Sequence, residues 1–209
     1  MRGAGMMKEL FFMGIAPVDG HIYRKTIEGN CMRCYAWSMD APNWTEISEV
    51  RVGSVPISKE QADLTLNGGK IGMAELLSQY YHAGQVDKAG KPYSLHPAAV
   101  AAKVDDENAK IAAFLHDTLE DTAMEPDTIK LLFGDEILDA VKVLTRKDDE
   151  SYEDFIKRCG ENPLARKVKL ADLEHNMDLS RLPNVTEKDR RRAEKYRKSA
   201  AYLHGLQHS

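Results

Sequence analysis

The chain has 209 residues, 43% of them hydrophobic and 30% charged, and its formal net charge is −4. This length suits one domain of moderate size, or one core domain with a small appendage, and the composition is typical of globular proteins. The slightly acidic balance argues against a general nucleic-acid-binding surface. No apolar run approaches the roughly 20 residues that cross a bilayer.

Neither the N-terminal apolar stretch nor the cysteines predict a secreted or zinc-stabilised protein. The segment Leu10–Val18 is short, follows an acidic residue and lacks a cleavage site, so it does not predict a signal peptide. Cys31 and Cys34 have metal-ligand spacing, but a structural zinc needs four ligands and His21 alone does not complete them. We expect two reduced cysteines in a strand and a cytoplasmic location.

Short runs of aromatic and β-branched residues, separated by turn formers, predict a small antiparallel sheet at the start of the chain. A capping-box pattern at Ser58 then predicts a short helix, which Asn67-Gly68-Gly69 ends. We therefore predict a β-rich module over residues 1–66 and a second domain over residues 67–209. The module is expected to be a lid, a self-association element or a site for a protein partner. The expected strands are Phe11–Met13, His21–Ile27, Cys31–Ser38 and Glu46–Val52.

From Lys70 onward the apolar residues recur every three or four positions, which predicts a mainly α protein overall. Prolines and capping residues mark helix starts, and glycines or prolines mark ends. The expected helices begin at Lys70 and then cover Pro97–Val104, Asn108–Glu120, Pro126–Phe133, Glu136–Leu144, Ser151–Gly160, Pro163–Leu182 and Thr186–Leu206.

Two histidines and two aspartates form a plausible ligand set for a divalent metal that keeps open positions for water and substrate. His116 and Asp117 are adjacent, His96 lies 20 residues before His116, and Asp172 lies 55 residues after Asp117. A bound cation produces hydroxide near neutral pH. The set therefore predicts metal-assisted hydrolysis of a phosphate compound.

An acidic pair, Glu120 and Asp121, follows the adjacent ligands by one helical turn. On a continuous helix, Glu120 shares the face of His116 and Asp117. We predict that Glu120 orients or deprotonates the metal-bound water. Asp121 is expected either to hold a neighbouring ligand or to relay a proton.

Asp172 and Asn176 are likewise one turn apart, so Asn176 can offer its amide to a substrate. Taken singly, the candidate residues also have structural explanations. His96 suits a helix entry, the acidic pair suits a solvated helix end, and Asp172 can pair with Lys169. Their occurrence together favours the metal site.

Three segments together resemble the HD-domain hydrolase of the RelA/SpoT alarmone family, which includes stand-alone small hydrolases. The resemblance extends over roughly residues 70–205. The segments that carry it are Gly84-Gln85 with Lys88-Ala89-Gly90-Lys91-Pro92-Tyr93-Ser94-Leu95-His96-Pro97, Ala112–Thr122 with its central His116-Asp117-Thr118-Leu119-Glu120-Asp121, and Val168–Asp172 with His175-Asn176-Met177.

The resemblance implies an all-helical HD fold that holds one metal ion, usually manganese. It implies removal of the 3′-diphosphate of guanosine tetra- or pentaphosphate, giving pyrophosphate and GDP or GTP. No synthetase domain is expected. The residues that match the family's site are His96, His116, Asp117 and Asp172 for the metal, Glu120 and Asp121 for catalysis, and Asn176 for the substrate.

The chain departs from the family pattern at two positions near the expected polyanion. Asp87 stands before Lys88 where the family has an arginine that helps to hold the base. Asp178 stands two residues after Asn176 where the family again has arginine. Either the substrate differs or other cations offset these acids, and we expect Lys88 to bind the substrate. The candidate cations are Lys88, Lys91, Arg146, Lys147, Lys167 and Arg181.

The last predicted helix is strongly basic, with seven Lys or Arg among the eleven residues Lys188–Lys198. This pattern predicts either a solvated face or a patch that attracts an anionic substrate or partner. Tyr93 and Tyr196 are candidates either for the core or for stacking on a base. Two rival functions remain: an HD nucleotidase or phosphodiesterase acting on another nucleotide, and a non-catalytic nucleotide sensor that signals through the N-terminal module.

Overall fold

The computed structural model describes residues 8–15, 18–28, 31–38, 42–51 and 54–206. The chain divides into two compact units, Met1–Leu76 and Leu77–Ser209. The first unit contains an antiparallel sheet, and the second is formed by helices. The predicted class, mainly α with a β-rich N-terminal region, is confirmed.

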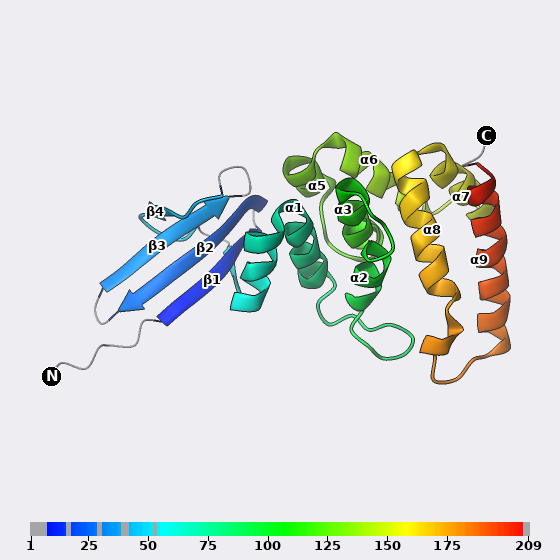
Figure 1. Ribbon diagram of the computed structural model, residues 1–209, viewed down its shortest axis with the longest axis horizontal. Coiled ribbons are helices and arrows are strands. Elements are labelled where there is room, and N and C mark those ends of the chain that lie inside the picture. Colours follow the sequence, from blue (N-terminus) through cyan, green and yellow to red (C-terminus); the bar gives the residue numbers. More distant parts are fainter. Residues whose placement is uncertain (1–7, 16–17, 29–30, 39–41, 52–53, 207–209) are drawn as a thin grey trace. The chain divides into compact units, whose positions relative to one another are not determined.

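The first unit is built on a five-stranded antiparallel sheet in the order β4-β3-β2-β1-β5 (Figure 1). Alternating apolar residues bury one another across the ladders, with Met13 paired to Ile22, and Ile22 to Trp37. Cys31 is exposed and Cys34 is buried, and both are free thiols as predicted. The strands are β1 (Lys8–Ile15), β2 (Val18–Glu28), β3 (Cys31–Ser38), β4 (Thr45–Ile47) and β5 (Ser54–Ile57).

The last predicted strand, Glu46–Val52, is largely wrong. Strand β4 ends at Ile47, bends follow, and Val52 lies outside the described residues. The sequence pattern did not reveal β5, because this strand is short and contains Pro56. Proline cannot donate to a central ladder, and β5 lies at the end of the strand order, where proline is tolerated.

Helix α1 (Lys59–Tyr81) contains the expected interruption at the glycines. Its capping box is present: the Ser58 backbone N–H donates to Gln61 Oε1 at 2.9 Å, and the Gln61 N–H donates to Ser58 Oγ at 3.1 Å. Gly69 has φ +56° and ψ −131°, a conformation that only glycine adopts readily. The helix therefore consists of two segments joined at a kink.

The kink brings the backbone of Gly72 against that of Leu64, and this contact yields a stability prediction. A Cβ atom at Gly72 would lie 1.7 Å from the Leu64 carbonyl oxygen, whereas one at Gly68 would meet nothing within 4 Å. We expect Gly72→Ala to destabilise the protein by about 1–3 kcal/mol, as overpacking does. Gly68→Ala is the matched control and should leave stability unchanged or raise it slightly. Thermal and urea denaturation measure both, and an unchanged Gly72→Ala protein would contradict the close contact.

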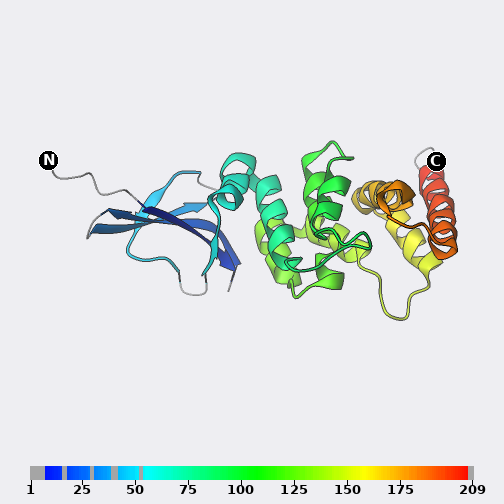
Figure 2. The same cartoon turned by 90° about the horizontal axis from the view of Figure 1, so that it is seen from below.

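The second unit follows the predicted helix order closely. Side chains cap the helices where the sequence indicated, with Asn162 accepting the Ala165 N–H and Thr186 forming a capping box with Asp189. Helices α8 and α9 lie side by side (Figures 1 and 2). The elements are α2 (Leu95–Ala101), α3 (Glu107–Leu115), α4 (Thr118–Asp121), α5 (Pro126–Phe133), α6 (Asp135–Leu144), α7 (Tyr152–Glu161), α8 (Pro163–Met177), η1 (Leu179–Arg181) and α9 (Glu187–Gly205).

Two of the predicted helices are each divided into two, and in both cases the first part ends at the candidate site. The segment predicted as Asn108–Glu120 is two helices, because α3 ends at Leu115 and α4 starts at Thr118. The Thr118 hydroxyl donates to the Leu115 carbonyl at 2.7 Å, which helps to close this break. The segment predicted as Pro163–Leu182 is also divided, because α8 ends at Met177 and a short 3-10 helix, η1, follows.

The core of the second unit lies among α3, α6 and α8. Ile111, Leu115, Val141 and Val168 are almost completely buried. Among the described residues, no helix combines the length and the apolar character needed to cross a membrane.

Candidate metal centre

Four side-chain atoms from three parts of the second unit converge on one point. His96 Nε2, from α2, lies 3.2 Å from Asp172 Oδ1 on α8 and 3.5 Å from Asp117 Oδ2. His116 Nε2 lies 3.1 Å from the same Asp117 oxygen and 3.9 Å from the Asp172 oxygen. The break between α3 and α4 places His116 and Asp117 side by side at this point. The predicted ligand set is therefore brought together.

The imidazole of His116 is oriented as a metal ligand requires. Its Nδ1 lies 2.7 Å from the Ala113 carbonyl oxygen, so Nδ1 donates a proton to that oxygen and Nε2 is the nitrogen that faces the cluster. His116 is 2% exposed, and its Nε2 makes no hydrogen bond. Nε2 instead faces the Asp117 and Asp172 carboxylates, at 3.1 and 3.9 Å, and a bound cation would bridge these groups.

His96 is oriented by a second histidine that the sequence analysis did not single out. Its Nδ1 lies 2.7 Å from Nδ1 of His175, and the two rings stack with centroids 4.9 Å apart. Burial, followed by the charges of His96 and Arg181, lowers the pKa of His175 to about 4, so the ring is neutral at pH 7. Neutral His175 can accept a hydrogen bond from the Nδ1–H group of His96. The other nitrogen of His96, Nε2, is then available to bind a metal. In the sequence, His175 follows Asp172 by three residues, about one helical turn, and this spacing places the two side chains on the same face of a helix.

Asp172 is held from two sides on its own helix. Lys169 Nζ donates to Oδ2 at 2.8 Å, and Asn176 Nδ2 donates to Oδ1 at 2.5 Å. The pairing with Lys169 is the structural explanation that the sequence offered for Asp172. It uses Oδ2, so Oδ1 still faces the two histidines. Burial opposes the charge on Lys169, but Asp172 outweighs it and raises the lysine's pKa.

The cluster strongly favours a positive charge at its centre. Burial alone would raise the pKa of Asp117 and Asp172, but neighbouring cations reverse this and hold both pKa values well below the usual range. Burial likewise disfavours charge on His116, yet Asp117 and Asp172 raise its pKa to about 9. Two carboxylates, one buried and one partly exposed, form with two imidazoles a donor set that suits a divalent transition metal. His96, His116 and Asp172, whose ligand atoms lie within 4.8 Å of one another, can bind a metal.

Tyr93 fixes the remaining ligand. Its hydroxyl donates to Asp117 Oδ2 at 2.6 Å, and its ring lies edge-on to His96 with centroids 5.6 Å apart. Burial and the charge of Asp117 raise the pKa of Tyr93, so the hydroxyl keeps its proton and remains a donor. Tyr93 therefore packs within the site and orients a ligand.

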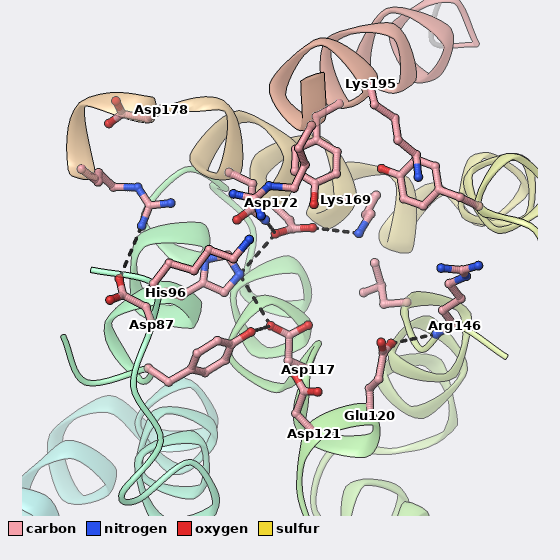
Figure 3. Close-up of a pocket in the computed structure, with 18 of the residues that line it drawn as sticks. Asp87, His96, Asp117, Glu120, Asp121, Arg146, Lys169, Asp172, Asp178 and Lys195 are labelled. Atoms are coloured by element: carbon pink, nitrogen blue, oxygen red, sulfur yellow. Dashed lines mark hydrogen bonds and ion pairs between the residues drawn. The ribbon is translucent and has the colours of Figure 1, made fainter. Parts of the chain in front are cut away.

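The cluster opens into a cavity of about 620 Å³ (Figure 3). Ligand pockets for small molecules usually measure about 300–1,000 Å³. All four remaining predicted site residues line it: Lys88, Glu120, Asp121 and Asn176.

The acidic pair lies on α4 at the cavity wall. The Arg146 backbone N–H donates to Glu120 Oε2 at 2.9 Å, which orients this carboxylate. Burial, with the negative charges of Asp117 and Glu120, raises the pKa of Asp121. The two carboxyl groups thus differ in environment, and Asp121 holds a proton more readily than an ordinary aspartate.

The first unusual acid, Asp87, is largely engaged within its own loop. Its Oδ1 accepts the backbone N–H groups of Ala89 at 2.8 Å and Lys91 at 2.9 Å. Its Oδ2 lies 3.8 Å from Nη1 of Arg181. Asp87 therefore stabilises the turn before Tyr93, and a nearby cation offsets its charge.

The second unusual acid, Asp178, caps η1. Its Oδ1 accepts the Ser180 backbone N–H at 3.0 Å and the Ser180 hydroxyl at 2.6 Å. The η1 turn places Arg181 in the cavity wall. Both departures from the family pattern are thus engaged in local structure.

Most of the cavity's cations come from α8, α9 and the adjoining loops. Of the cations proposed to offset the acids, Lys88, Arg146 and Arg181 line the cavity, whereas Lys167 pairs with Asp106 outside it. Lys91 and Lys147 are not among the lining residues. The basic helix α9 contributes three more lining residues: Arg192, Lys195 and Tyr196. Lys195 and Tyr196 contact the ring of Tyr152, which also lines the cavity.

The loop that carries Arg146 is held by a partly buried ion pair between Arg158 and Glu150, which gives a pH prediction. Arg158 donates to both oxygens of Glu150, at 2.7 and 2.6 Å, and this lowers the pKa of Glu150 from an ordinary value of 4.5 to about 2. The resulting stability is fully present above pH 4.5 and is lost as pH falls towards 2. Glu150→Gln should therefore cost about 2 kcal/mol at pH 7 and much less at pH 2.5, measured by urea denaturation. A pH-independent loss would contradict the charge assignment, and exposed Glu153→Gln is the control.

No family model matches the chain, but individual proteins do. A probable guanosine-3′,5′-bis(diphosphate) 3′-pyrophosphohydrolase from Synechocystis is 38% identical over 111 residues, which is 46% of this chain and 15% of that protein. A GTP pyrophosphokinase from Myxococcus xanthus is 32% identical over 122 residues, 50% of this chain and 16% of that protein. The predicted resemblance is confirmed, although the chain matches only about one-sixth of these relatives' length.

A solved structure shares the fold. The protein is described as a metazoan ortholog of SpoT that hydrolyzes ppGpp, and the match has a TM-score of 0.55 at 24% identity. It covers 64% of this chain and 84% of that protein. The likeness supports the helical architecture around the cavity.

Proposed function

We propose that residues 67–209 form an HD-type metal-dependent phosphohydrolase domain. Its proposed reaction removes the 3′-diphosphate of guanosine tetra- or pentaphosphate and releases pyrophosphate. The observation that carries the proposal is the cluster of buried His96, His116 and Asp172 with partly exposed Asp117, opening into a cavity lined by both acids and cations. The identity of 32–38% to pyrophosphohydrolases and a pyrophosphokinase supports the substrate class.

The four clustered residues would hold one divalent cation, with manganese as the proposed ion. Such a cation supplies Lewis acidity and lowers the pKa of bound water. The proton on His116 Nδ1 is committed to a carbonyl, and the Tyr93 hydroxyl holds the Asp117 carboxylate. These contacts fix the ligands before the substrate binds, which reduces reorganisation.

The acidic pair is proposed to move protons. Glu120, oriented by the Arg146 N–H, would accept a proton from the attacking water. Asp121 has a raised pKa, so it is suited to donate a proton to the departing 3′ oxygen. The water's oxygen forms the new bond to phosphorus as the bond to the 3′ oxygen breaks.

The cavity's cations are proposed to bind the phosphate groups, as predicted for Lys88. Arg146, Arg192 and Lys195 line the same cavity and would compensate the negative charge of a diphosphate. Asn176 donates to Asp172 through its amide nitrogen, which leaves its oxygen to accept a substrate hydroxyl.

The experiment that tests the proposal is incubation of the full chain with Mn²⁺ and guanosine tetraphosphate, scored for pyrophosphate and GDP. Absence of both products, with metal shown to be bound, would overturn the substrate assignment. A panel of other nucleotides tests the rival HD nucleotidase or phosphodiesterase, because monoester cleavage releases phosphate and no pyrophosphate. A sensor would bind nucleotide without turnover, and the N-terminal module remains the predicted element for a protein partner or self-association.

A further inference from the structure

The cavity contains an arginine with unused hydrogen-bonding capacity. Arg181 Nε is buried and makes no hydrogen bond, and Nη1 lies 3.8 Å from Asp87, beyond ordinary hydrogen-bond length. A guanidinium offers five N–H donors, and a buried donor without an acceptor costs free energy. The side chain lines the same cavity as the metal cluster. A ligand with acceptor oxygens would satisfy it.

Two acids hold this arginine in place. Asp178 shapes η1 by accepting two hydrogen bonds from Ser180, and η1 ends at Arg181. Asp87, itself fixed by backbone N–H groups of its loop, stands opposite the guanidinium. The head group is therefore oriented before any ligand binds, which reduces the entropy that binding would cost.

The cavity places cations on two sides of the metal cluster. Figure 3 shows Asp87 and Asp178 on one side of His96 and Asp172, and Arg146 on the other. Glu120, next to the Arg146 backbone, lies on that second side. The group to be cleaved must lie near the cluster and Glu120. Arg181 is therefore left for a different part of the substrate.

We propose that Arg181, together with Lys88, binds the phosphate group that is not cleaved, the 5′-diphosphate of the nucleotide. Asp87 and Asp178 are positioning residues for Arg181. This inference rests on the proposed function for the identity of the nucleotide. A phosphate is favoured over a base because the unused N–H donors require acceptor oxygens, and a guanidinium binds phosphate through two parallel hydrogen bonds.

The test is calorimetric titration of the Mn²⁺-loaded full chain with GDP, guanosine and pyrophosphate. Arg181→Ala should weaken GDP binding about 10- to 100-fold and leave pyrophosphate within about 2-fold. Lys195→Ala should show the opposite pattern, with weaker binding of pyrophosphate and little change in the affinity for GDP. Arg191→Ala is the matched control, because Arg191 lies outside this cavity and pairs with Glu187. It should change neither affinity.

Three results with Arg181→Ala would overturn the inference: an unchanged GDP affinity, equal losses for GDP and pyrophosphate, or a loss for guanosine equal to that for GDP. The third would place Arg181 on the nucleoside. A wild-type protein that binds no GDP at millimolar concentration would overturn it as well.

The positioning residues are tested by milder changes. Asp87→Asn keeps the loop's acceptor oxygen but removes the charge, and we expect GDP binding to weaken about 2- to 5-fold with kcat unchanged. Arg181→Lys keeps the charge without the fork, and should recover only part of the affinity lost in Arg181→Ala. A fall in kcat with unchanged KM in Asp87→Asn would contradict a positioning role.

These binding measurements separate the two proposals. If wild type releases no pyrophosphate from guanosine tetraphosphate but GDP binding depends on Arg181, the hydrolase proposal fails and the phosphate site stands. If wild type is active and Arg181→Ala alters neither GDP affinity nor KM, the phosphate site fails and the hydrolase stands.

Discussion

Asp117→Ala is expected to abolish metal binding and to reduce turnover by at least about 1,000-fold. Asp117 Oδ2 lies within 3.5 Å of both imidazole nitrogens and also accepts the Tyr93 hydroxyl. Its removal deletes a ligand and leaves Tyr93 without its acceptor. Metal analysis after gel filtration should find stoichiometric Mn²⁺ in the wild type and none in the variant.

A second readout does not require turnover. Ligand that binds only the folded state adds stability, about 2.7 kcal/mol at 100 times the dissociation constant. Mn²⁺ should therefore raise the melting temperature of the wild type and leave that of Asp117→Ala unchanged. The matched control is Asp139→Ala, which alters an exposed aspartate on α6 and should retain both metal and activity. Full metal occupancy in Asp117→Ala would disprove the assigned ligand set.

Glu120→Gln is expected to lower kcat by about 100- to 10,000-fold while metal content stays at the wild-type level. Glutamine is close to isosteric and can still accept the Arg146 N–H, but it cannot take a proton from water. The ligand atoms of the metal cluster do not include Glu120, so the centre should remain intact. Rapid-quench measurement of pyrophosphate, with metal analysis on the same sample, separates the two properties.

The control for this variant is Glu125→Gln, an exposed carboxylate just beyond α4. It should have wild-type kcat. A Glu120→Gln protein that keeps more than half of the wild-type kcat would exclude Glu120 as the proton acceptor, and attention would move to Asp121.

The proposed ligand residues could be selected from the sequence because the side-chain types and their order along the chain indicate a metal site without knowledge of the three-dimensional geometry. His96 lies at the start of α2, His116 and Asp117 lie at the break between α3 and α4, and Asp172 lies inside α8. The acidic pair was recognised for the wrong geometric reason. A continuous helix was assumed, and the break at Asp117 is what places both ligands together.

Other parts could not be predicted because they depend on contacts between distant segments. Arg181 is one of the six cations that the sequence offers to offset the two acids, but nothing near Asp87 selects this residue, which lies 94 positions later. The contact between His175 and His96 likewise spans 79 positions. In the sheet, the edge position that tolerates Pro56 follows from strand order, which local pattern does not encode.

The Asp87–Arg181 pair has a consequence for how this cavity can change over evolution. Reversing the charge at Asp87 alone would place a second cation against Arg181 and would also remove the oxygen that closes its loop. The effects of substitutions at positions 87 and 181 are therefore coupled. A charge change at one position is tolerated only with a compensating substitution at the other. Relatives with arginine at the position of Asp87 are expected to lack arginine at position 181, so the two residues should covary as an exchanged pair.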